Sequence, residues 1–216
     1  MMTSEMTFLH RYVPAAATGR RPLLLLHGTG GTEDDLLPLG RTVAPGAALI
    51  SPRGKVLENG MPRFFRRLAE GVFDEEDVKR RAAELAAFVA DAASQYGLER
   101  PVALGFSNGA NMAAAVLLLH PGALAGAILL RPMAPLAEPP EADLSGTKVL
   151  ILSGSTDPMV PPGSVARLAA DLTRGGAEVE ERVLPAGHAV SQADLSLAAT
   201  WLDRNGRVPA SAPANE

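Results

Sequence analysis

The chain has 216 residues, which is enough for one domain with a substantial hydrophobic core. Apolar residues make up 47% of it and charged residues 20%, a composition typical of a soluble globular protein. The net charge of −4 argues against nucleic acid and against an anionic membrane as partners. Because the sequence has no cysteine, it excludes disulfides, thiolate metal sites and cysteine nucleophiles.

Neither targeting nor membrane spanning is indicated by the sequence pattern. The N-terminal stretch MMTSEMTFLHRYVPA lacks the basic region and the following continuous apolar region of a signal peptide. The longest apolar runs, such as Leu23–Leu26 and Met112–Leu119, are too short to span a bilayer. We therefore expect a cytoplasmic protein. Residues 1–205 are predicted to form a single domain, and residues 206–216, rich in Pro and Ala, are predicted to form a flexible C-terminal tail.

Short apolar runs alternate with amphipathic stretches along this domain. The predicted strands are Thr7–Val13, Pro22–Leu26, Ala47–Ser51, Val102–Gly105, Ala125–Leu130, Lys148–Ser153 and Glu178–Leu184. The predicted helices are Glu33–Val43, Asp74–Tyr96, Asn108–Leu119, Pro162–Arg174 and Gln192–Arg204. Several of the strands are apolar throughout, which is typical of parallel strands covered on both faces. The alternation predicts an α/β fold, with a doubly wound, mostly parallel sheet of about seven strands and helices on both faces.

The helix over Asp74–Tyr96 has the clearest signals. Its apolar residues recur at spacings near three and four. Asp74 is suited to cap its N-terminus, and Gly97 is suited to end it. Ligands of such doubly wound sheets bind at the carboxyl ends of the strands, so candidate active-site residues should follow predicted strands.

A serine follows one of these strands in a motif that suits a nucleophile. The segment Gly105-Phe106-Ser107-Asn108-Gly109 matches G-x-S-x-G between a predicted strand and a predicted helix. Glycines flank the serine because side chains there would collide with neighbouring backbone. The helix N-terminus beneath the serine favours developing negative charge. On its own the motif also fits a glycine-rich turn with a capping serine.

A serine nucleophile needs a base to accept its proton. His188 lies in LPAGHAVS, directly after the last predicted strand, and is the candidate base. His10 lies within the first strand and His120 lies at a helix end, where surface or structural roles explain them. His27, in HGTGG, is interpreted as a residue that braces its loop.

A carboxylate should orient the imidazole and stabilise its charged form. Asp157 lies in SGSTDPMVPP, directly after the strand KVLILS, although it could also serve only as a turn residue before Pro158. Three other acids are less well placed: Asp143 precedes a strand, Asp171 lies inside a helix, and Asp194 lies in a first helical turn. The order Ser107, Asp157, His188 is the order that this fold requires.

Acyl transfer also needs donors for the oxyanion of the tetrahedral intermediate. We expect one donor to be the backbone N–H of Asn108, directly after the nucleophile. The other should come from the loop HGTGG, with Thr29 as the first choice and Gly30 as a near alternative. A phosphate-binding turn is the rival interpretation of GTGG, but the loop lacks the Lys and Ser/Thr of a P-loop and the spacing of a dinucleotide fingerprint.

In combination, GFSNGA, HGTGG, SGSTDPMVP and AGH resemble the α/β-hydrolase superfamily and, more narrowly, its phospholipase/carboxylesterase family, over Pro22 to Arg204. The segment SPRGKVLENGMPRFFRRLAEGVFDEEDV resembles the stretch between the third strand and the long helix in the bacterial carboxylesterases of that family. The resemblance implies a minimal hydrolase without a cap domain, often a homodimer. It implies cleavage of short- to medium-chain carboxylic esters by an acyl-enzyme route that needs no metal and no cofactor. It also carries over the triad roles of Ser107, Asp157 and His188 and the oxyanion roles of Thr29 and Asn108.

The same resemblance places the loop GMPRFFRR at the substrate entrance. The alternative is that its phenylalanines belong to the core or to an interface and that its arginines form a solvated face. Long acyl chains would need an apolar channel, and no long apolar loop is present to build one. The candidate substrate contacts are Phe64, Phe65, Met133 and Met159.

Three other functions use the same residues. A thioesterase or lysophospholipase, or a peptidase, could employ an identical triad, because sites and not folds determine function. A catalytically silent hydrolase-fold protein that binds a ligand is the alternative from another class, but such proteins usually lose a triad member. The presence of Ser107, Asp157 and His188 together favours the ester hydrolase.

Overall fold

The computed structural model describes residues 6–208 of the chain and contains the predicted central sheet. The seven strands lie in the order β1-β3-β2-β8-β9-β10-β11, and all neighbouring pairs are parallel except β1 and β3. Their bounds are β1 His10–Val13, β2 Leu23–Leu26, β3 Leu49–Pro52, β8 Val102–Phe106, β9 Gly126–Leu130, β10 Lys148–Gly154 and β11 Glu178–Leu184. The predicted doubly wound, mostly parallel α/β fold is therefore confirmed.

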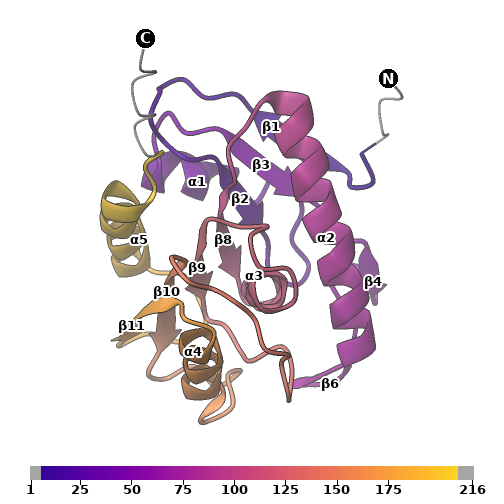
Figure 1. Ribbon diagram of the computed structural model, residues 1–216. Coiled ribbons are helices and arrows are strands. Elements are labelled where there is room, and N and C mark those ends of the chain that lie inside the picture. The colour runs from indigo at the N-terminus through magenta and orange to yellow at the C-terminus, as the bar shows by residue number, and fades with distance from the viewer. Residues whose placement is uncertain (1–5, 209–216) are drawn as a thin grey trace.

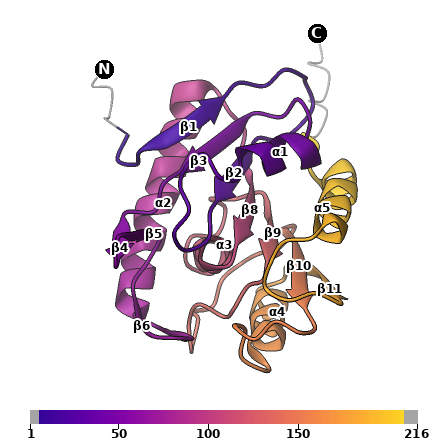
Figure 2. The same ribbon diagram turned by 180° about the vertical axis from the view of Figure 1, so that it is seen from behind.

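Five helices cover the two faces of this sheet (Figures 1 and 2). The helices are α1 Leu37–Val43, α2 Glu75–Tyr96, α3 Asn108–Leu119, α4 Ser164–Arg174 and α5 Gln192–Asn205. Leu24 and Leu26 of β2 pack in one hydrophobic cluster with α2, α3 and α4, while Leu23 and Leu25 pack in a second with α1 and α5. Because side chains alternate across a strand, an all-leucine strand satisfies both faces at once.

The predicted ends of the long helix are confirmed. The side chain of Asp74 accepts a hydrogen bond from the N–H of Asp77, and Gly97 adopts a left-handed conformation with φ of 64°. Two other helices begin later than predicted. Helix α1 begins at Leu37 and not at Glu33, because Glu33 is buried in an ion pair with Arg53.

Helix α4 likewise begins at Ser164 and not at Pro162. Gly163 has a φ of 78°, a left-handed conformation that cannot belong to a right-handed helix. The first strand is also shorter than predicted, since its pairing with β3 covers only His10–Val13. In each case the element exists as expected and its first residues were assigned wrongly.

Two small hairpins that the sequence analysis did not predict lie between β3 and α2. They pair β4 Val56–Glu58 with β5 Met61–Arg63, and β6 Arg67–Ala69 with β7 Val72–Phe73. The turn of the first hairpin is Asn59-Gly60, with positive φ at both residues. An Asn-Gly pair in that conformation is the strongest short-range hairpin signal, so the sequence did carry this information.

The chain leaves α5 along its own N-terminal region. Arg207 forms a β-bridge with Arg20, and the N–H of Val208 donates to the carbonyl of Gly19 at 3.1 Å. The first three residues of the predicted flexible tail are thus hydrogen-bonded, and its remainder, 209–216, lies outside the described residues. Among residues 6–208, no helix is both long and apolar enough to cross a membrane.

Candidate active site

Ser107 occupies a strained turn between β8 and α3. Its φ of 51° and ψ of −114° are rarely adopted by a residue with a side chain. A Cβ at Gly105 would lie 2.6 Å from the carbonyl oxygen of Gly109, and a Cβ at Gly109 would overlap the carbonyl of Leu26. The glycines of G-x-S-x-G are therefore required by the close approach of α3 to the neighbouring strands.

Three loops at the carboxyl ends of the strands bring the predicted triad together. The Nε2 atom of His188 lies 2.9 Å from Ser107 Oγ, and its Nδ1 atom lies 2.8 Å from Asp157 Oδ2. The side chain of Asp157 is 1% exposed and that of His188 is 18% exposed. An acid next to Nδ1 fixes the tautomer in which Nδ1 carries the proton and Nε2 can accept one from the serine.

The three competing aspartates are engaged elsewhere. Asp171 forms an ion pair with Arg174, and Asp194 forms one with Arg131. The carboxylate of Asp143 accepts a hydrogen bond from the N–H of Ser145. The structure therefore places one carboxylate, that of Asp157, against the imidazole of His188.

A small cavity lies beside Ser107 and is called the Ser107 cavity below. The residues of the two predicted oxyanion donors, Thr29 and Asn108, line it. The N–H of Gly30, the alternative donor, is used by the carbonyl of Pro62 at 2.9 Å. By contrast, within residues 6–208 the backbone N–H groups of Thr29 and Asn108 donate to no protein acceptor. These two groups are thus available to a developing oxyanion.

Thr29 is held by an arginine that sequence analysis did not single out. Arg63 donates from Nη1 to Thr29 Oγ1 at 2.8 Å and from Nε to the carbonyl of Phe65 at 3.2 Å. Its side chain is 3% exposed and paired with Glu58. Burial lowers the pKa of the Arg63 guanidinium, and the charge of Glu58 opposes that shift. The interpretation of this arginine as part of a solvated face is therefore wrong.

The predicted substrate contacts divide into two groups. Met133 and Met159 line the Ser107 cavity as expected. Phe64 and Phe65 do not, and the expectation that they line the substrate entrance is wrong. Phe64 is 2% exposed with its ring centroid 4.7 Å from that of His27, and Phe65 is fully buried.

Phe64 and Phe65 lie in the connection between the two hairpins, after β5 and before β6, and their side chains are buried in the core. Phe65 packs edge-on against Phe73 at 5.0 Å, and the N–H of Phe64 donates to Asn108 Oδ1. Arg63 and Arg67 of the loop GMPRFFRR, which was placed at the substrate entrance, do line the cavity, and the cavity residues that sequence analysis missed are Glu70, Gly71, Phe73 and Asn111. For Asn111 a signal existed: it follows Asn108 by three residues on a helix and so lies on the same face.

His27 braces the oxyanion loop, as predicted. Its side chain is 1% exposed, Nδ1 lies 2.7 Å from the carbonyl oxygen of Gly28, and Nε2 accepts a hydrogen bond from the N–H of Gly54 at 3.0 Å. One nitrogen donates and the other accepts, so the neutral ring fits this environment. Burial lowers the pKa of His27, although the Gly28 carbonyl opposes the shift.

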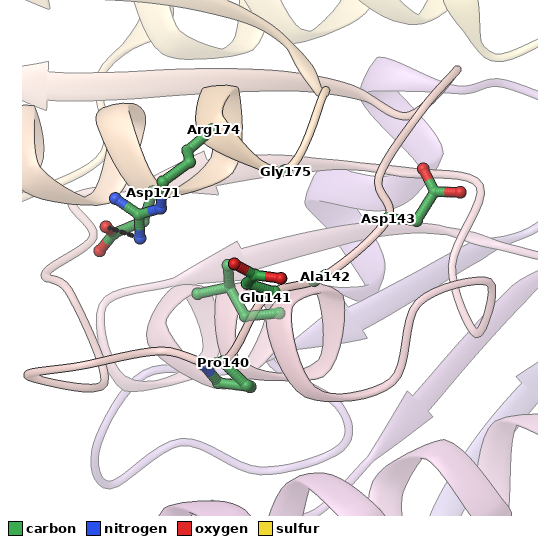
Figure 3. A pocket seen from close by; sticks show the side chains of 8 residues that line it. Pro140, Glu141, Ala142, Asp143, Asp171, Arg174 and Gly175 are labelled. Carbon is green, nitrogen blue, oxygen red and sulfur yellow. Dashed lines mark hydrogen bonds and ion pairs between the residues drawn. The ribbon is translucent and has the colours of Figure 1, made fainter.

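A separate hollow lies beside α4 (Figure 3). It is lined by Pro140, Glu141, Asp143 and the ion-paired Asp171 and Arg174, among others. None of its lining residues belongs to the triad or to the Ser107 cavity. This hollow is therefore separate from the candidate active site at the carboxyl ends of the strands.

Comparison with known proteins identifies relatives over almost the whole chain. The sequence profile of the family described as Phospholipase/Carboxylesterase matches residues 13–205. The Bacillus subtilis (strain 168) protein named "Putative hydrolase MhqD" is 43% identical over 193 residues, 88% of this chain and 96% of that one. The carboxylesterase of Bacillus cereus is 43% identical with a TM-score of 0.90, covering 94% of this chain and 97% of its own. That of Mesorhizobium loti is 38% identical with a TM-score of 0.87, covering 93% and 96%.

The buried histidine generates a prediction about stability. Because its pKa is lowered on folding, the neutral ring of His27 contributes stability that is complete above the unfolded pKa of about 6.5 and is lost as the pH falls through the lower folded pKa. We expect His27→Gln to flatten the fall in unfolding free energy between about pH 7.5 and pH 5.5. Urea denaturation across this range measures it, with the other three histidines present in both proteins. Parallel curves for the two proteins would contradict the assignment.

Proposed function

Because the chain belongs to the phospholipase/carboxylesterase family and is a carboxylic ester hydrolase, we propose that it cleaves short- to medium-chain esters with Ser107 as its nucleophile. His188 is the general base, and Asp157 orients and stabilises its imidazole. The observation that carries this proposal is the continuous hydrogen-bonded chain from Ser107 Oγ through both ring nitrogens of His188 to Asp157 Oδ2.

The reaction proceeds in two halves through an acyl-enzyme. Ser107 Oγ attacks the ester carbonyl carbon while His188 Nε2 accepts the hydroxyl proton. The carbonyl oxygen becomes an oxyanion, which the N–H groups of Thr29 and Asn108 stabilise, each by on the order of 3 kcal/mol. Collapse of this intermediate breaks the bond to the alkoxy group, which leaves as the alcohol with the proton from His188.

Deacylation repeats these steps with water in place of the serine. His188 accepts a proton from the water as its oxygen attacks the acyl carbon, and the second tetrahedral intermediate forms in the same oxyanion hole. Ser107 then leaves with that proton, and the carboxylic acid is released. The protein ends the cycle unchanged and one water molecule is consumed, while residues of this chain supply the nucleophile, the base and the oxyanion donors.

The shape of the cavity supports the preference for short and medium acyl chains. Apolar groups from Phe73, Met133 and Met159 lie around the small space beside Ser107. A second, larger hollow shares Gly71 and Met133 with it and continues toward residues 161–164 at the start of α4. A short acyl group fits the first space, and a medium chain can extend into the second.

Removal of the nucleophile tests the assignment. We expect Ser107→Ala to lower kcat for p-nitrophenyl acetate by a factor of about 10⁴ or more, because no other group can form the acyl-enzyme. Its Tm should stay within a few degrees of the wild-type value, since only one oxygen atom is lost. Retained turnover by a folded variant would show that the nucleophile is misassigned, or that this residue serves only in ligand binding.

The dependence of kcat/KM on acyl-chain length tests the proposed contact between Met159 and the acyl chain. An acyl methylene that no apolar surface covers loses about 0.8 kcal/mol of hydrophobic stabilisation, which lowers kcat/KM by roughly a factor of four. We expect Met159→Ala, which removes apolar surface from the cavity wall, to lower the octanoate-to-acetate ratio of kcat/KM for p-nitrophenyl esters at least fourfold. Leu57→Ala, an equally apolar truncation on the exposed face of β4, should leave the ratio unchanged. Equal ratios in all three proteins would contradict the placement of the acyl chain.

A further inference from the structure

A fully buried arginine lies behind the triad without touching it. Arg131 follows β9 with a φ of 55° and is 0% exposed, the largest of the completely buried side chains. Burial of a guanidinium is costly unless its donors are all satisfied, and a positive φ in a residue with a long side chain is uncommon. Arg131 thus combines a buried charge with a strained backbone, and both cost free energy. We therefore expect the structure to need an arginine at this position.

The guanidinium of Arg131 binds the backbone on both sides of His188. Its Nε donates to the carbonyl of Gly187 at 2.9 Å, and its Nη2 donates to the carbonyl of Ala189 at 3.0 Å. The planar guanidinium thus contacts the residue before and the residue after His188. These contacts fix the backbone that carries the imidazole.

Arg131 also reaches the strand that leads to Asp157. Its backbone N–H and its Nη1 both donate to the carbonyl of Leu152, near the end of β10, at 2.8 and 3.2 Å. Since Asp157 follows that strand by three residues, one side chain connects the supports of the triad base and of the triad acid.

Asp194 completes this arrangement. Its two carboxylate oxygens accept from Nη1 and Nη2 of Arg131 at 2.7 and 2.8 Å, and both side chains are 0% exposed. Asp194 Oδ2 also accepts from the N–H and the hydroxyl of Ser191, at 2.7 Å each. Burial alone would raise the pKa of Asp194, but these hydrogen bonds hold it below its usual value. The carboxylate therefore stays charged and fixes the plane of the guanidinium.

We infer that Arg131 and Asp194 are positioning residues for catalysis: their buried ion pair holds the Gly187 and Ala189 carbonyls and thereby aligns His188 between Ser107 and Asp157. The inference rests on the proposed function. Loss of the pair leaves the Ser107 cavity and its substrate contacts in place, because neither residue lines that cavity. It therefore affects the chemical step more than substrate binding.

The test compares Arg131→Lys and Asp194→Asn with the wild-type protein on p-nitrophenyl acetate. A lysine keeps the charge but cannot span the two carbonyls, and an asparagine keeps the shape but not the charge. We expect kcat to fall about 10- to 100-fold in both, with KM within twofold, because a small misalignment of a catalytic group costs about that much. Asp194→Asn is nearly isosteric, so it keeps the test available if Arg131→Lys does not fold.

Gly97→Ala is the control. It places a side chain at the left-handed residue that ends α2, just before β8 and so at the opposite end of the sheet from Ser107, and it leaves the Arg131–Asp194 pair and its hydrogen bonds intact. We expect it to lower Tm by a few degrees and to leave kcat within twofold of the wild-type value. A loss of kcat that merely follows loss of stability would appear in this control as well.

Two outcomes overturn the inference. One is a kcat within threefold of the wild type in a folded Asp194→Asn protein; the other is an equal loss of kcat in Gly97→Ala. Failure of the proposed function is distinguishable, because then wild type and Ser107→Ala would hydrolyse the ester at the same rate.

Discussion

The turn that carries Ser107 can exist only because α3 approaches the sheet at backbone contact. A non-glycine residue at a φ of 51° costs on the order of 1–3 kcal/mol, and the surrounding packing must supply that energy. Helix α3 is the most deeply buried helix of the protein, with all of Asn108–Leu118 buried between the sheet and α2. The N–H of Ser107 also donates to the carbonyl of Leu130 on the adjacent strand at 2.8 Å. The strain at Ser107 is thus held by the core, which keeps the residue on the turn between β8 and α3.

The other parts of the site are loops, and buried polar side chains hold them. His27 connects the oxyanion loop to Gly54, and Arg63 connects Thr29 of that loop to the segment that follows β5. Arg131 does the same for the loop that carries His188. Each of these side chains is at most 3% exposed. The hydrogen bonds from these buried side chains fix the loops and so preserve the spacing of the atoms that acyl transfer would need. The surface above Ser107 is left free for a substrate.

Local sequence patterns were sufficient for the sheet and for the placement of the triad side chains. The apolar runs of β2, β8 and β9 are typical of central parallel strands, whose carboxyl ends lie at the same edge of the sheet. On that basis Ser107, Asp157 and His188 could be predicted to lie close together from the sequence. The start of α1 was predicted wrongly beside a tertiary contact, the Glu33–Arg53 ion pair, and the start of α4 was predicted wrongly at the left-handed Gly163. Phe64 and Phe65 were predicted wrongly because the orientation of the short segment between two hairpins depends on packing partners far away in the sequence, such as His27 and Asn108 for Phe64. The role of Arg131 had no sequence signal, because its acceptors are backbone carbonyls from segments about 20 and 56–58 residues away.

The central claim is that His188 makes Ser107 an exceptionally reactive nucleophile. It is tested most directly by treating the wild-type protein with a fluorophosphonate at neutral pH and mapping the adduct by peptide mass spectrometry, with His188→Gln as the comparison. The account predicts one adduct, on the peptide that contains Ser107, and labelling slowed by orders of magnitude in the variant. An unlabelled wild-type protein, an adduct on another residue, or equal labelling of the two proteins would contradict it.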